Sequence, residues 1–96
     1  MIKYAILTLV HDTVSDYLTS FGSETIVTNE TRLVGSNAVV DSVGLVSVIV
    51  DVEGRLADAG FDISLLSDKA MSMQRSPFRS VETLAEFIHE ELNPPA

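Results

Sequence analysis

The sequence contains no cysteine and no tryptophan, and only six of its 96 residues are lysine or arginine. Without cysteine the chain can form no disulfide, thiolate nucleophile or cysteine metal site, so nothing in it requires an oxidising compartment. Six basic against fourteen acidic residues give a formal net charge of −8, which repels the phosphate backbone of a nucleic acid and an anionic lipid surface. We therefore expect no nucleic-acid ligand, and protein partners that present basic patches.

Long apolar runs are also missing. No stretch approaches the roughly twenty uninterrupted apolar residues that cross a bilayer. The apolar segment 1–10 carries Lys3 and Tyr4 and lacks a small-residue cleavage pattern, so we expect neither membrane insertion nor a signal peptide, and cytoplasmic localisation is the default. The length, with 46% apolar and 21% charged residues, predicts one small domain over residues 1–96.

The first third of the chain predicts a long helix followed by a long loop. From Ile2 to Phe21 the apolar residues recur at steps of three and four, as one face of a helix requires, and Gly22 supplies a stop. Residues 23–41 are rich in Ser, Thr, Asn and Gly, and a loop of this length is often functional. Four apolar residues are expected to pin it to the core: Leu33, Val34, Val39 and Val40.

The rest of the chain predicts further helices. Residues 43–56 also fit a strand by their alternating valines, but their helical spacing continues until Gly60, and we take them as a helix. Residues 64–71 can form a short helix, and the last helix begins after Ser80, an N-cap candidate, and ends before Pro94. The predicted fold is all-α: a small four-helix bundle with three longer helices, one short helix and a long loop between the first and second.

The most specific pattern stands where the long loop meets the valine-rich helix, at Asp41, Ser42 and Val43. This junction resembles the Asp-Ser-Leu type signature that opens the second helix of the acyl carrier proteins. The leading helix, the long first loop and the last helix follow in the order that this family has. The resemblance covers nearly the whole chain and is strongest over residues 39–56 and 80–88.

The resemblance implies that Ser42 carries 4′-phosphopantetheine, attached through a phosphodiester by a phosphopantetheinyl transferase that uses coenzyme A and a divalent metal. Acyl groups would then travel as thioesters on the thiol of this arm. The implied partners are the transferase and acyl-loading, condensing or acyltransferase enzymes of fatty acid or polyketide biosynthesis. By this resemblance the chain is a stand-alone carrier and not an enzyme.

The residues at the junction agree with that role on physical grounds. A serine at a helix start is open to solvent, and the unpaired amides and positive end of the helix stabilise a phosphodiester anion. Asp41 is suited to cap the helix and to orient Ser42 or the metal of the transferase. Alone, an Asp-Ser pair is no more than an ordinary cap, so its position within the matching order of elements carries the inference.

The valine-rich helix has two apolar sides, about 170° apart at 100° per residue. One side is expected to pack in the core: Leu45, Val48, Ile49, Val52 and Leu56. The other side, which we call the valine stripe, consists of Val43, Val46 and Val50 and begins beside Ser42. It is suited to docking a partner enzyme, with Asp51 and Glu53 as a charged rim. The alternative is that the loop 23–41 covers part of the stripe.

Other interpretations of the chain remain to be separated by experiment. Ser42, His11 and an aspartate could form a catalytic triad, but the chain has no Gly-x-Ser-x-Gly nucleophile elbow. An unmodified helical interaction module with a carrier-like fold would use the stripe only for binding. We expect a monomer, because the stripe must stay available to successive enzymes.

One departure from the family pattern bears on the pathway. Many carriers of fatty acid synthesis have acidic or other polar residues along the second helix, where this chain has Gly44, Ser47, Gly54 and Arg55. This difference favours a specialised pathway over housekeeping fatty acid synthesis.

Overall fold

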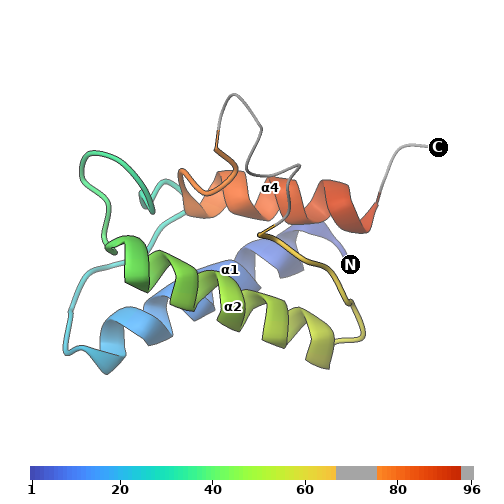
Figure 1. Cartoon of the computed structure of the whole chain (residues 1–96), viewed down its shortest axis with the longest axis horizontal. Helices are drawn as coiled ribbons and strands as arrows, with labels where there is room; N and C mark the ends of the chain where they lie inside the picture. Colours follow the sequence, from blue (N-terminus) through green and yellow to red (C-terminus); the bar gives the residue numbers. More distant parts are fainter. Residues whose placement is uncertain (67–75, 94–96) are drawn as a thin grey trace.

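The structure, a computed structural model, describes residues 1–66 and 76–93, and that part of the chain contains three helices (Figure 1). They are α1 (Lys3–Ser20), α2 (Ser42–Asp58) and α4 (Val81–Leu92). Within the described residues the β-pairing consists of one isolated bridge, between Arg32 and Ser80. The all-α prediction is confirmed, and the valine-rich segment is a helix. None of the helices in the described ranges is both long and apolar enough to cross a lipid bilayer.

The predicted short helix over residues 64–71 is not confirmed. Residues 64–66 follow α2 without a helical turn, and residues 67–71 lie outside the described part of the chain. The observed helices are therefore the three long ones, and the predicted total of four is not reached in the described residues.

Helix α1 is central, because it packs against both α2 and α4 (Figure 1). Each helix contributes a buried apolar face to one core, and burying such a side chain stabilises the fold by about 1.5–3 kcal/mol. The largest fully buried helix side chains are Ile6, Val10 and Val14 of α1, Val48, Ile49, Val52 and Leu56 of α2, and Val81, Leu84 and Ile88 of α4.

The ends of α1 differ from the predicted apolar face. Ile2 and Phe21 are 70% and 74% exposed, because they lie just outside the helix, beyond the turns that pack on α2 and α4. Thr13 instead takes a fully buried position in α1. Its hydroxyl donates to the carbonyl oxygen of Leu9 at 2.7 Å, so the buried polar atom is satisfied within the helix.

Both predicted glycine stops are confirmed. Gly22 and Gly60 have φ of 76° and 94°, in the left-handed region that glycine adopts without steric cost. After α1, the Ser23 amide donates to the Leu18 oxygen at 3.0 Å and the Gly22 amide to the Thr19 oxygen at 2.9 Å. This pair of bonds is a Schellman motif, which satisfies the last carbonyls of a helix.

The predicted N-cap of the last helix is also confirmed. The Thr83 amide donates to the Ser80 hydroxyl oxygen at 3.2 Å, and the Ser80 amide donates to the Thr83 hydroxyl oxygen at 2.9 Å. This reciprocal arrangement is a capping box. It gives an acceptor to the Thr83 amide, which has none within the helix, and to the amide of the N-cap residue Ser80.

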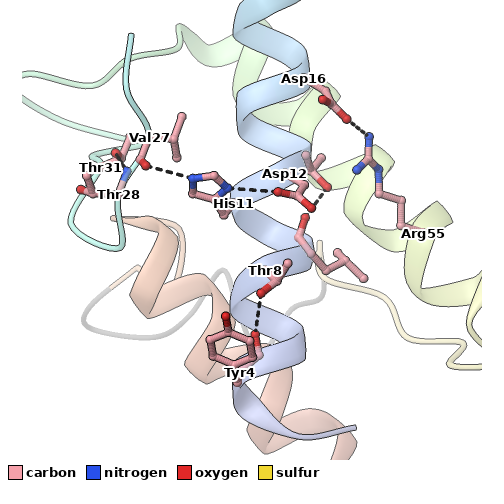
Figure 2. A network of polar contacts seen from close by, with 11 residues as sticks. Tyr4, Thr8, His11, Asp12, Asp16, Val27, Thr28, Thr31 and Arg55 are labelled. Atoms are coloured by element: carbon pink, nitrogen blue, oxygen red, sulfur yellow. Dashed lines mark hydrogen bonds and ion pairs between the residues drawn. The ribbon is translucent and has the colours of Figure 1, made fainter.

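The long loop between α1 and α2 is held by apolar and polar contacts. Leu33 is buried, and the other predicted pins, Val34, Val39 and Val40, pack half-buried against the core. The Leu33 amide donates to the Arg79 carbonyl at 2.8 Å, which ties the loop to the chain before α4. Figure 2 shows a second tie, from the His11 ring on α1 to the Val27 carbonyl at 3.0 Å.

An ion pair joins α1 to α2 on the surface. The Arg55 guanidinium of α2 donates to an Asp16 carboxylate oxygen of α1 at 2.8 Å, as Figure 2 shows. The hydrogen bond to Asp16 raises the pKa of Arg55 above its ordinary value. The guanidinium therefore stays charged throughout the neutral pH range.

Candidate functional site

The loop ends and α2 begins at Asp41, which caps the helix as predicted. Its backbone is extended, with φ −86° and ψ −176°, and its carboxylate oxygen Oδ1 accepts the Gly44 amide at 2.7 Å. Its carbonyl oxygen accepts the Leu45 amide at 2.8 Å, which is the first bond of the helix. Such a cap stabilises a helix by about 1 kcal/mol.

Ser42 is the first residue of α2 and is exposed to solvent. At this position a backbone amide has no acceptor inside the helix, and the same holds for the amide of Val43. The partial positive charge of the helix start favours an anion here. An exposed hydroxyl on a capped helix start is thus accessible to a modifying enzyme, and a phosphate ester on it would lie near free donors.

A pocket of about 300 Å³ adjoins Ser42. It lies between the loop and the first turn of α2, and its wall is partly apolar and partly polar. The lining residues are Leu33, Val34, Gly35, Ala38, Val40, Asp41, Ser42 and Leu45. The sequence pattern marks several of these residues as core pins but does not indicate that they leave a pocket beside the serine.

The valine stripe is open to solvent. Val43, Val46 and Val50 are 75%, 48% and 55% exposed, so the loop leaves them uncovered. The opposite face packs as predicted, with Val48, Ile49, Val52 and Leu56 buried and Leu45 half-buried. Three adjacent exposed valines beside the exposed serine form an apolar surface of the kind that marks interaction sites.

The two acidic residues expected at the rim of the stripe have partners within the chain. Asp51 is exposed, and its carboxylate accepts a hydrogen bond from the Arg55 side chain at 3.4 Å. Glu53 is half-buried, and its carboxylate accepts the Leu65 amide at 3.1 Å. Glu53 therefore also fixes the segment that follows α2.

The sequence pattern marks Tyr17 only as part of the apolar face of α1, but the structure places its ring against Gly44 in the first turn of α2. Tyr17 also lines a second pocket of about 310 Å³, together with Phe21 and the loop residues Val39 and Val40. Asp41 lines both pockets. The loop residues Val40 and Asp41 thus lie between two pockets, one shared with the end of α1 and the other with Ser42.

His11 does not join Ser42. Its ring nitrogens contact the Val27 carbonyl and the Asp12 carboxylate, at 3.0 and 3.1 Å (Figure 2). It lines a different pocket, together with Tyr4, Leu7, Thr8 and Asn29. The described residues thus give no support to a triad of Ser42 and His11.

Comparison of the chain with models of protein families, with curated proteins and with solved structures finds no match. The functional assignment therefore depends on the chemistry of the residues and on the geometry around Ser42.

Proposed function

We propose that this protein is a cytoplasmic acyl carrier protein in which Ser42 carries 4′-phosphopantetheine. The observation that carries the proposal is the exposure of Ser42 at the capped start of α2, next to the open valine stripe. An accessible hydroxyl and an adjacent docking surface are what a modifying transferase and later acyl-transfer enzymes require. The chain itself performs no chemistry in this role.

The residues around Ser42 fit the prosthetic group. The first-turn amides of α2 and the helix dipole favour a phosphodiester at this position. The pocket of about 300 Å³ beside Ser42 gives the base of the arm a wall that is partly apolar and partly polar. When bound, the group supplies the thiol that carries the acyl thioester, a function for which the chain has no cysteine of its own.

The fold proposed for this function is the four-helix bundle of the acyl carrier type. Helix α1, the long loop, α2 and α4 occur in the order of that fold. The predicted fourth, short helix does not begin at residue 64, because residues 64–66 are not helical, and its other residues, 67–71, lie outside the described part of the chain.

The proposed partners approach the valine stripe. Val43, Val46 and Val50 would enter an apolar recess of a transferase or of an acyl-loading, condensing or acyltransferase enzyme. The net charge of −8 would guide the carrier to basic patches around that recess, at a rate that falls with salt. The differences along α2 favour a specialised pathway of fatty acid or polyketide type, with the carrier acting as a monomer.

The decisive experiment is coexpression with a broad-specificity phosphopantetheinyl transferase, followed by intact-mass measurement. We expect the chain to gain the mass of one phosphopantetheine group. Ser42→Ala should abolish the gain, whereas Ser47→Ala, at another exposed serine of α2, should retain it.

An unchanged mass of the folded chain would contradict the proposal. The open stripe would then support the second candidate, an unmodified helical module that binds another protein. A mass gain that survives Ser42→Ala would place the attachment at another residue.

A further inference from the structure

The loop residue Arg32 is held close to Ser42 by the backbone. The Val39 amide donates to the Arg32 carbonyl at 3.0 Å, which closes a turn over residues 32–39. Val39 precedes Ser42 by three residues, and three residues span at most about 10 Å. The path from the Arg32 carbonyl to the serine backbone is therefore this span plus the 3.0 Å hydrogen bond. The bridge to Ser80 fixes Arg32 from its other side.

The guanidinium of Arg32 stands beside the wall of the Ser42 pocket. A Cβ built on Gly35 would lie 3.8 Å from an Nη atom of Arg32. Gly35 and Ser42 line the same pocket of about 300 Å³. The side chain of Arg32 is exposed, so its donors can turn toward an anion at the mouth of this pocket.

Arg32 differs from the other described basic residues in having no partner for its side chain. Lys3 pairs with Glu86 at 3.3 Å, Arg55 pairs with Asp16, and Arg79 donates to the Ser76 carbonyl. Within residues 1–66 and 76–93, the Arg32 guanidinium makes neither an ion pair nor a hydrogen bond. Among the described residues of this acidic chain, Arg32 is thus a cation without a partner, and it lies beside Gly35 in the wall of the pocket that Ser42 also lines.

We propose that Arg32 binds the phosphodiester of the group attached to Ser42, an inference that rests on the proposed function. A guanidinium presents paired N–H donors that match two phosphate oxygens, and such charge-assisted bonds are stronger than neutral ones. The contact limits the directions in which the arm leaves the helix start. Because the site is exposed, salt weakens the contact.

The experiment compares modified chains by phosphorus-31 NMR, after intact mass has established that each carries one group. The variants are Arg32→Gln, Arg32→Lys and Lys3→Gln. Lys3→Gln is the charge-matched control, because Lys3 lies in the first turn of α1, at the opposite end of the molecule from the start of α2 (Figure 1). The reference is the phosphorus resonance of the same chain unfolded in urea.

In the unaltered chain and in Lys3→Gln, we expect the resonance of the folded protein to differ from the unfolded reference and to move toward it as salt rises. Arg32→Gln should lose at least half of this difference and of the salt response, and Arg32→Lys should retain an intermediate part. Equal resonances in the unaltered chain and Arg32→Gln would refute the role of Arg32 while leaving the carrier function intact. Absence of any mass gain would refute the carrier function, and the inference with it.

A second measurement needs no variant and so does not depend on the folding of one. The Arg32 Nε–H resonance of the nitrogen-15-labelled chain should shift when Ser42 is modified, while those of Arg55 and Arg79 stay in place. An unmoved Arg32 resonance would contradict the contact.

Discussion

The hydroxyl oxygen of Tyr17 approaches the backbone of Gly44 so closely that a Cβ on this glycine would stand 2.7 Å from it. The same Cβ would lie 3.1 Å from Cβ of Val40. Glycine destabilises a helix interior by up to about 1 kcal/mol relative to alanine. The first turn of α2 nevertheless has a glycine at position 44, because α1 and the loop approach so closely there that a larger residue would clash. This contact packs α1 and the loop against the first turn of α2, which begins at Ser42.

Gly44→Ala is therefore expected to destabilise the fold by about 1–2 kcal/mol, because overpacking outweighs the gain in helix propensity. Gly54 is the matched control in the same helix, since a Cβ there meets nothing within 4 Å. Gly54→Ala should stabilise by up to about 1 kcal/mol. Urea denaturation measures both changes.

The phenol of Tyr17 provides the internal test of that cause. Adding Tyr17→Phe to Gly44→Ala removes the nearest atom and should recover part of the lost free energy of unfolding. If Gly44→Ala stabilises the protein as Gly54→Ala does, the contact with Tyr17 is not limiting.

The Asp41 cap predicts a difference between two substitutions. Asp41→Ala removes the acceptor of the Gly44 amide and should lower the free energy of unfolding by about 1 kcal/mol. Asp41→Asn keeps an oxygen acceptor and should cost less. Thermal or urea denaturation of the two variants measures the difference, and equal losses would show that the side-chain bond is not what stabilises the helix start.

The valine stripe predicts a loss of function without a loss of stability. Val46→Asp places a charge in the proposed interface, while Val46 is 48% exposed in the free chain. We expect kcat/KM for modification by the transferase to fall roughly tenfold, the equivalent of about 1.4 kcal/mol. The change in unfolding free energy should stay within about 0.5 kcal/mol.

Thr8→Asp is the control for the added charge, because Thr8 is exposed on α1. Its kcat/KM should remain close to that of the unaltered chain. Equal rates for both variants would remove the stripe from the proposed docking surface.

The ion pair between Asp16 and Arg55 should contribute little to stability. Their side chains are 67% and 33% exposed, and exposed pairs contribute about 0.2–1 kcal/mol. A double-mutant cycle with Asp16→Asn and Arg55→Gln should give a coupling energy in this range at low salt. The coupling should shrink in about 1 M salt, where the Debye length is about 3 Å; a coupling that salt leaves unchanged would contradict a screened surface pair.

Short-range rules explain which parts of the fold were predictable. The glycine stops at Gly22 and Gly60 and the caps at Asp41 and Ser80 depend on bonds between residues at most five positions apart. The β-branched residues of α2 obscured its type, but the helical period of its buried face decided it, because burial outweighs propensity.

The candidate site was predictable only in part. The exposure of Ser42 follows from the position of the cap, and the helix period predicts the valine stripe. That the loop leaves the stripe open was decided only by the structure. The bond between Glu53 and the Leu65 amide and the exposure of Phe21 did not follow, because each depends on where a neighbouring segment lies.

The amino-acid order alone thus determined where the three long helices begin and end and that an exposed serine stands at the start of α2, since the caps and glycine stops act within about one turn of helix. Only the tertiary structure decided that Tyr17 rests on Gly44, that Arg32 returns to the neighbourhood of Ser42 and that a pocket remains between the loop and α2. The physical reason is that these relationships are set by the packing of segments distant in the chain, and side-chain packing depends on the positions of all its neighbours.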